Sequence, residues 1–160
     1  MIKHINDALF NELIEAAKAS PRLRSHKNFH DDYTAPVQRL FIGLVRGTYV
    51  RPHLHPQANK WEIIMAVKGR TGLVLFDDSG KITEKLILEP GMSNVGIENP
   101  PNTWHTVFPL DENSVIMEIK EGPFDPKQIT HFADWAPEED PNHRYLDWLE
   151  QAKIGDSFER

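Results

Sequence analysis

The chain has 160 residues and no cysteine, and its 24 acidic and 18 basic side chains give a formal net charge of −6 at pH 7. A chain of this length forms one domain with a full core, and the lack of cysteine excludes disulfides and thiolate metal sites. The acidic balance argues against a nucleic-acid surface, and no apolar run has the length of a membrane span or a signal-peptide core. We therefore expect a soluble, cytoplasmic protein that binds neither nucleic acid nor membranes.

Residues 1–36 are predicted to form one helix and a lead-in segment that packs on the rest of the fold. Asn6 is a suitable N-cap, and apolar residues follow it at helical spacing. Ser20 precedes Pro21, and a residue before proline avoids the α region, so the helix is expected to end there. Residues 22–36 are polar and lack periodicity, which predicts irregular structure. We interpret His30 as a surface histidine; the alternative is a proton-transfer group in a pocket.

Residues 37–122 are predicted to form a β-barrel of short strands. Strands are expected at about 37–46, around His53, and at 61–67, 71–76, 82–88, 93–99, 106–109 and 114–120, with turns rich in Gly, Pro, Asn and Asp between them. This pattern indicates an all-β barrel or sandwich. Neither face of the strand at 37–46 is purely polar, so we expect the outside of the barrel to be covered there.

Residues 123–160 are predicted to wrap the barrel and to end in a helix. The segment up to residue 141 is rich in proline and acidic residues. Residues 143–153 place four large apolar side chains on a short helix: Tyr145, Leu146, Trp148 and Leu149. The expected organisation thus has three parts, at 1–36, 37–122 and 123–160.

Three histidines and one glutamate have the pattern of a metal site. His53 and His55 are two residues apart, so in an extended strand both imidazoles point to the same face. Glu62 lies on the next predicted strand, and His105 follows a proline-rich turn at 100–104. Three nitrogens, a carboxylate and no thiolate suit a divalent first-row metal such as Fe, Mn, Ni, Cu or Zn. Glu62 is either a ligand or a group that orients a ligating histidine.

These segments resemble the two sequence motifs of the cupin superfamily. The first motif is resembled by Gly47, His53-Leu54-His55, Glu62 and Gly69, and the second by residues 100–105. The flanking segments at 20–24, 37–40, 60–62 and 121–126 are similar to the WbuC-type cupin fold metalloproteins. The resemblance implies an all-β fold: a single cupin (jelly-roll) β-barrel with an N-terminal helix and a short C-terminal helix. It also implies a homodimer, one metal inside the barrel and, through the family's name, polysaccharide biosynthesis.

Two features depart from the common cupin motifs. Six residues separate His55 from Glu62, where three or four are usual. Asn102 stands where glycine is usual, and asparagine is the non-glycine residue that best tolerates left-handed turn geometry. We therefore expect the turn before His105 to keep its shape.

Four further residues are predicted to contact a small-molecule ligand. Arg51 and Arg39 suit a bidentate hold on a carboxylate or phosphate, and the alternative for each is a salt bridge. Tyr49 is a candidate for proton transfer in the same pocket. Trp104 is a candidate for lining its mouth, and the alternative is ordinary packing.

The leading interpretation is a metal-dependent enzyme acting on a small polar molecule such as a sugar or an organic acid. The predicted cofactor is one divalent transition metal (Fe, Mn, Ni or Zn) held by His53, His55, Glu62 and His105. Iron would support dioxygenase chemistry, and zinc or manganese would support an isomerase or lyase. One alternative is a non-catalytic metal- or ligand-binding module. Another is a metal-independent sugar epimerase or isomerase, which a wide separation of His53 and His105 would favour.

Overall fold

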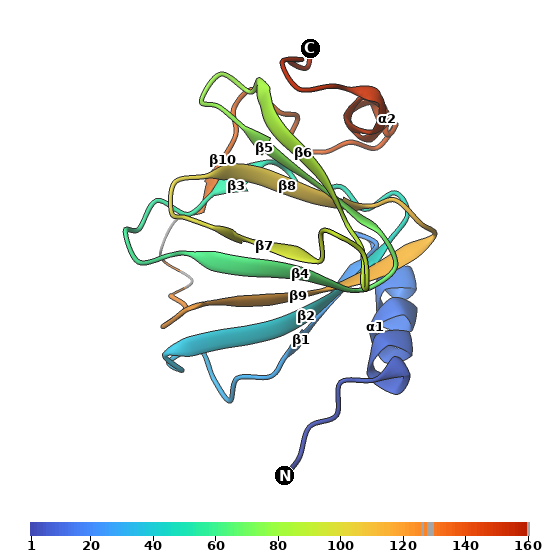
Figure 1. Ribbon diagram of the computed structural model, residues 1–160, viewed down its shortest axis with the longest axis vertical. Coiled ribbons are helices and arrows are strands. Elements are labelled where there is room, and N and C mark those ends of the chain that lie inside the picture. Colours follow the sequence, from blue (N-terminus) through green and yellow to red (C-terminus); the bar gives the residue numbers. More distant parts are fainter. Residues whose placement is uncertain (126, 128–129, 160) are drawn as a thin grey trace.

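The computed structural model describes residues 1–125, 127 and 130–159, and it shows two antiparallel β-sheets packed face to face (Figure 1). Residues 126, 128, 129 and 160 lie outside the described residues, and Pro126 in one of the flanking motifs is among them. The first sheet has the order β1 (Arg24–Asn28), β2 (Val37–Val45), β9 (Asn113–Glu121), β4 (Glu62–Lys68), β7 (Gly96–Asn99). The second has the order β10 (His131–Phe132), β3 (His53–Leu54), β8 (Trp104–Pro109), β5 (Thr71–Phe76), β6 (Ile82–Leu88).

Helix α1 (Asp7–Ala19) covers the outer face of the first sheet (Figure 1). It begins as predicted, because the Asn6 side chain accepts a hydrogen bond from the Leu9 N–H at 3.2 Å. Its apolar side packs on Phe41 of β2, which is fully buried although it points away from the second sheet. At Gly43 a Cβ would lie 2.8 Å from the Leu13 carbonyl oxygen, so only glycine allows the helix to approach β2 this closely.

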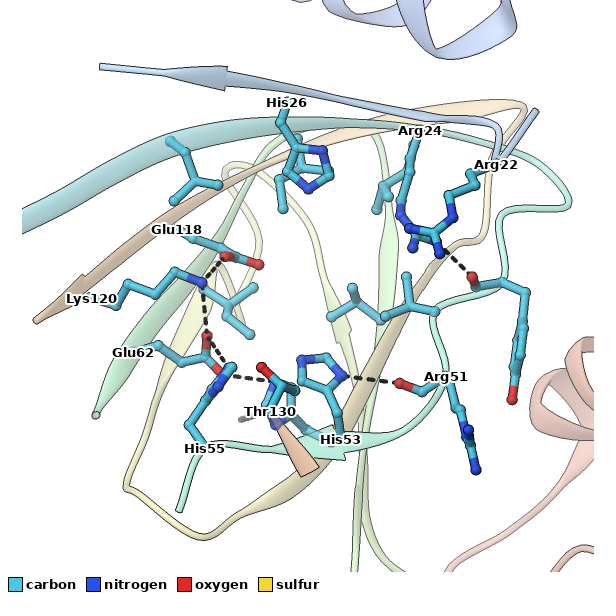
Figure 2. A pocket seen from close by; sticks show the side chains of 18 of the residues that line it. Arg22, Arg24, His26, Arg51, His53, His55, Glu62, Glu118, Lys120 and Thr130 are labelled. Atoms are coloured by element: carbon cyan, nitrogen blue, oxygen red, sulfur yellow. Dashed lines mark hydrogen bonds and ion pairs between the residues drawn. The ribbon is translucent and has the colours of Figure 1, made fainter. Parts of the chain in front are cut away.

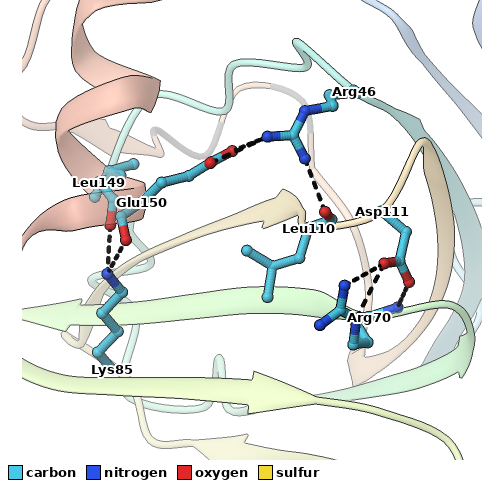
Figure 3. Close-up of polar contacts among 7 residues, drawn as sticks. All are labelled: Arg46, Arg70, Lys85, Leu110, Asp111, Leu149 and Glu150. Carbon is cyan, nitrogen blue, oxygen red and sulfur yellow. Dashed lines mark hydrogen bonds and ion pairs between the residues drawn. The ribbon is translucent and has the colours of Figure 1, made fainter.

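Helix α2 (Arg144–Gln151) packs on the outer face of the second sheet, where Tyr145 and Leu149 contact the cluster that contains Val74 and Phe108. Lys85 of β6 closes its C-terminal end by donating to the carbonyl oxygens of Leu149 at 2.6 Å and Glu150 at 3.0 Å (Figure 3), and to that of Ala152 at 2.8 Å. A cation there is favourable, because the last carbonyls of a helix have no partner within the helix. Neither of the described helices is long and apolar enough to cross a bilayer. The predicted all-β fold with a helix at each end is confirmed.

Strand β1 corrects the prediction that residues 22–36 are irregular. It pairs with β2 from Arg24↔Leu44 to Asn28↔Leu40. Ser25 and Lys27 face α1, with Ser25 Oγ 2.7 Å from the Leu13 oxygen and Lys27 Nζ 2.7 Å from Glu12. The intervening side chains face the space between the sheets. Because both faces of this strand are polar, it has no hydrophobic period that a sequence pattern could reveal.

The space between the two sheets is partly packed and partly hollow. Buried aliphatic residues from both sheets fill one part of it, among them Leu44, Leu73, Leu88 and Ile116. The other part is a cavity of about 790 Å³, a size typical of small-molecule sites. The barrel therefore has a solid core beside a chamber that can hold a ligand.

Candidate metal centre and ligand cavity

The three histidines predicted as ligands come together at the wall of this cavity. His53 and His105 are direct cross-strand partners on β3 and β8, and their ring centroids are 4.4 Å apart. The centroid of His55 lies 5.3 Å from that of His53. One nitrogen from each ring lies within 4.8 Å of the other two. Nitrogens about 2 Å from a shared ion are separated by roughly 3–4 Å, so small side-chain rotations would bring all three onto one metal.

Backbone carbonyls hold two of these imidazoles in one orientation. His53 Nδ1 lies 3.0 Å from the Arg51 oxygen, and His105 Nδ1 lies 2.8 Å from the Thr103 oxygen. A carbonyl can only accept, so each Nδ1 carries a proton and each Nε2 is left as the nitrogen that can bind a metal. Asn102 has the expected left-handed backbone, with φ of 59°, and its N–H donates to the His55 oxygen at 2.9 Å. The turn before His105 is thus bonded to the segment that carries His55.

Glu62 reaches the histidines across the long gap in the motif. Its side chain is almost fully buried, with Oε1 2.7 Å from His105 Nε2 and Oε2 3.8 Å from His55 Nε2 (Figure 2). Even so, the buried His55 Nε2 has no hydrogen-bond partner among the described residues. An unpaired buried polar atom is costly, and a cation shared with Glu62 would satisfy it. The donor set therefore fits a divalent metal.

The charge state of these groups also suits metal binding. Burial, followed by repulsion from neighbouring histidines, lowers the pKa of His53, so this ring stays neutral. Burial opposes the charge of Glu62 as well, but His105 and Lys120 hold the Glu62 pKa well below its usual range. Burial lowers the pKa of His105, but the charge and hydrogen bond of Glu62, together with the Thr103 oxygen and Glu118, raise it by more, so the net shift is upward. Without metal, the excess proton therefore sits between His105 and Glu62, where a cation would replace it.

Charged residues that the sequence did not single out extend the site along the first sheet. Lys120 is the cross-strand partner of both Gln38 and Glu62, which gives a polar row across the inner face. Its ammonium lies 2.9 Å from Glu118 Oε2 and 3.9 Å from Glu62 Oε2 (Figure 2). The sequence does contain a signal for the position of these two residues. Side chains in a strand alternate between its faces, so Glu118 and Lys120 point inward together with the buried Ile116.

The structure also places His30 differently from the prediction. It is 6% exposed and lines the cavity, so it is not a surface histidine. Its Nδ1 contacts both backbone groups of Arg39, the nitrogen at 3.0 Å and the oxygen at 2.9 Å. Its Nε2 is buried and has no partner in the described part of the chain. His30 therefore offers a polar atom that a ligand can reach.

The four predicted ligand-contacting residues divide into two groups. Arg51 and Tyr49 line the edge of the cavity, but the Arg51 guanidinium donates to the Ala133 oxygen at 2.8 Å and the Tyr49 hydroxyl to the Pro137 oxygen at 2.6 Å. The polar ends of both side chains thus anchor the C-terminal segment. In Figure 2 the Arg51 side chain extends away from the three ligand residues labelled there.

Arg39 and Trp104 are not among the residues that line the cavity, and their contact with a ligand stays a prediction. Arg39 lies on the outer face of β2, where its guanidinium donates to the Phe29 oxygen at 3.2 Å. Trp104 precedes the inward-facing His105 and therefore points outward, with its indole N–H 3.0 Å from Asp78. Its ring packs edge-on against Trp135.

Three solved structures share this fold. An oxalate oxidase in complex with the substrate analogue glycolate superposes with a TM-score of 0.56 at 19% identity, over 79% of this chain and 64% of that one. KdgF from Halomonas sp. gives 0.52 at 21% identity, over 69% of this chain and 86% of that one. A cupin 2 conserved barrel domain protein from Rhodopseudomonas palustris gives 0.51 at 14% identity, over 68% and 66% of the two chains. The chain thus has the predicted cupin fold, and it spans less than two thirds of the oxalate oxidase chain.

Sequence comparison adds one family match. The model of the family described as Domain of unknown function (DUF6016) matches residues 5–88, which include α1, β1 and the segment with His53, His55 and Glu62. No curated protein sequence matches the chain.

Proposed function

The chain belongs to the DUF6016 family, and we propose that it binds one divalent first-row transition metal through His53, His55, Glu62 and His105. The observation that carries this proposal is the convergence of three imidazole nitrogens within 4.8 Å of one another, with the Glu62 carboxylate 2.7 Å from one of them. Three nitrogens and one oxygen suit Fe, Mn, Ni or Zn. Once bound, such a metal would supply a Lewis acid or, as iron, a centre for dioxygen chemistry.

We further propose that the bound metal acts on a small polar molecule in the adjoining cavity. The cavity reaches the three histidines directly, which favours a ligand-binding or catalytic centre over a closed structural one. Its apolar wall, formed partly by Ile64 and Val107, keeps water away from the buried donors. The ammonium of Lys120 would stabilise negative charge beside Glu62. Dioxygenase and isomerase chemistry both fit these residues, and the identity of the metal separates them.

The alternative of a metal-independent epimerase or isomerase is not favoured. It would be expected if His53 and His105 were too far apart to share an ion, but their rings are neighbours. A non-catalytic module that binds metal and ligand uses the same site, and it differs only in the absence of turnover.

Several finer assignments are part of the same proposal. The flanking segments at 20–24, 37–40, 60–62 and 121–126 support membership of the WbuC-type cupin fold metalloproteins, which would link the protein to polysaccharide biosynthesis and a sugar substrate. A homodimer and a cytoplasmic location are proposed on the same basis. The division at 1–36, 37–122 and 123–160 also stays a proposal, with β1 and β10 joining the sheets from the flanking parts.

The test is elemental analysis of protein purified without a chelating tag. Wild type is compared with His53→Ala/His105→Ala and with the control His4→Ala/His131→Ala, which removes two exposed histidines. We expect about one metal per chain in wild type and control, and almost none in the first variant, because losing two of four ligands leaves too few donors. Equal metal content in the two double variants would refute the ligand assignment.

The metal found then directs the search for activity. Iron calls for oxygen-consumption assays with small organic acids and sugars, and manganese, zinc or nickel calls for isomerase and lyase assays. A full metal complement with ligand binding but no turnover would identify a binding module.

A further inference from the structure

A basic wall faces the cavity from β1. Arg24, His26 and Asn28 alternate along the strand and line the cavity. Arg22, in the exposed turn before the strand, lines it as well. Figure 2 shows Arg22 and Arg24 together on one side of the cavity, with Glu118 and Lys120 on the other. The Lys120 ammonium is neutralised by Glu118 at 2.9 Å. Arg51 also lines the cavity, but its guanidinium lies 3.8 Å from Glu138 and donates to the Ala133 oxygen. Arg22 and Arg24 are the remaining cationic side chains in the described lining.

Among the described residues, no carboxylate oxygen lies within 4.0 Å of the guanidinium of Arg22 or Arg24, and Glu139 acts on Arg24 only from a longer distance. Other arginines of the chain do form such pairs, for example Arg46 with Glu150 at 2.8 Å and Arg70 with Asp111 at 2.7 Å (Figure 3). Arg39 and Arg144 also lack such a pair, but they do not line the cavity, whereas Arg22 and Arg24 do.

Arg24 is also anchored through one nitrogen of its guanidinium. It is half-buried, and one of its nitrogens donates to the Tyr49 oxygen at 2.7 Å. A guanidinium has five N–H donors, so several remain for a ligand. Burial, followed by repulsion from Arg22, lowers the pKa of Arg24, and Glu139 offsets part of this shift. A carboxylate or phosphate would neutralise the two guanidinium groups and match their planar donor geometry.

The distance from this anion site to the histidines limits the length of the ligand. Tyr49, whose oxygen anchors Arg24, precedes His53 by four residues. Four residues of extended chain span at most about 14 Å. A cavity of about 790 Å³ that connects these two positions has room for a molecule of the size of a sugar acid.

We propose that Arg22 and Arg24 bind the anionic group of the ligand, which is a sugar-sized molecule with a carboxylate or a phosphate at one end. Its other end, with hydroxyl or carbonyl oxygens, reaches the histidines. This second contact rests on the proposed metal site, whereas the anion site does not.

The proposal is tested by calorimetric titration of metal-loaded and chelator-treated protein with three probes of similar size. D-glucuronate carries a carboxylate, glucose 6-phosphate carries a phosphate, and glucose is neutral. The variants are Arg22→Ala and Arg24→Gln, and the control Lys153→Ala removes an exposed charge elsewhere. Circular dichroism and thermal melting establish that each variant is folded, and Arg24→Lys retains the charge if Arg24→Gln does not fold.

We expect at least one anionic probe to bind and glucose to bind at least tenfold more weakly. Arg24→Gln should weaken anion binding by about 10–100-fold and Arg22→Ala by about tenfold, because charged hydrogen bonds are lost. Lys153→Ala should bind like wild type. The tighter of the two anions identifies carboxylate or phosphate as the preferred group. Equal binding of glucose, unchanged affinity in both arginine variants, or no binding of either anion up to about 10 mM would overturn the proposal.

Metal analysis of the same samples separates this inference from the proposed function. Arginine-dependent anion binding in protein that takes up no metal would overturn the metal site and leave the anion site intact. Stoichiometric metal together with anion binding that does not depend on the arginines would overturn the anion site and leave the metal site intact.

Discussion

The cavity has a histidine end, formed by His53, His55 and His105, and an arginine wall, formed by Arg22 and Arg24. These two regions are built in different ways. His53 and His105 lie on paired strands in the second sheet, and backbone carbonyls fix both rings. Arg24 lies on β1, at the edge of the first sheet, where it is half-buried and bonded through one nitrogen. Metal ligands need fixed geometry, which a central strand provides, whereas an anion tolerates a more adaptable partner. The two regions should therefore respond differently to the same perturbations.

Removing the metal should have the largest effect. A ligand present at a thousand times its dissociation constant stabilises a fold by about 4 kcal/mol, so chelation should lower the free energy of unfolding by roughly that amount. The measurement is urea unfolding with and without metal. His53→Ala should abolish the difference and Arg24→Gln should retain it. Loss of the difference in Arg24→Gln would show that the two regions are not independent.

Replacing the carboxylate should have a smaller effect confined to the histidine end. Glu62→Gln keeps the size of the side chain but removes the charge beside His105. We expect metal affinity to fall by about 10–100-fold, which is the range for losing a group that binds or orients a ligand. Competition with a chromophoric chelator measures this change. Wild-type affinity in the variant would mean that Glu62 serves neither role.

A substitution in the contact between α1 and β2 should lower the free energy of unfolding on the side of the molecule that carries the arginine wall. Gly43→Ala places a methyl group 2.8 Å from the Leu13 carbonyl oxygen, so the helix must move outward. Overpacking of this kind costs about 1–3 kcal/mol. Glu15→Ala, on the exposed side of the same helix, should change the free energy of unfolding by less than about 0.5 kcal/mol. Chemical denaturation compares the two, and equal values would contradict the close packing of α1 on β2.

The sequence predicted the histidine end well because its signals are local. His53 and His55 are two residues apart, so their side chains point to the same face of any extended chain. The turn before His105 marks the third ligand. The arginine wall has no such signal, because β1 is polar on both faces.

The difficulty of placing Arg39 from the sequence has a related physical cause. In β2 both faces are apolar because α1 covers the outer one, so alternation could not decide on which side Arg39 lies. Trp104 is different, because its neighbour His105 had already been assigned to the inside and adjacent residues in a strand point to opposite faces. That outcome could be deduced from the sequence.

The contact between α1 and β1 has a consequence for how ligand preference can diverge in this family. Ser25 and Lys27 bond to α1, and they alternate along β1 with Arg24 and His26, which face the cavity. The helix is therefore the support on which the arginine wall rests. Substitutions on the buried side of α1 would tilt β1 and move its guanidinium groups while leaving every residue that touches a ligand unchanged. Selectivity could then drift between relatives whose cavities are identical in sequence.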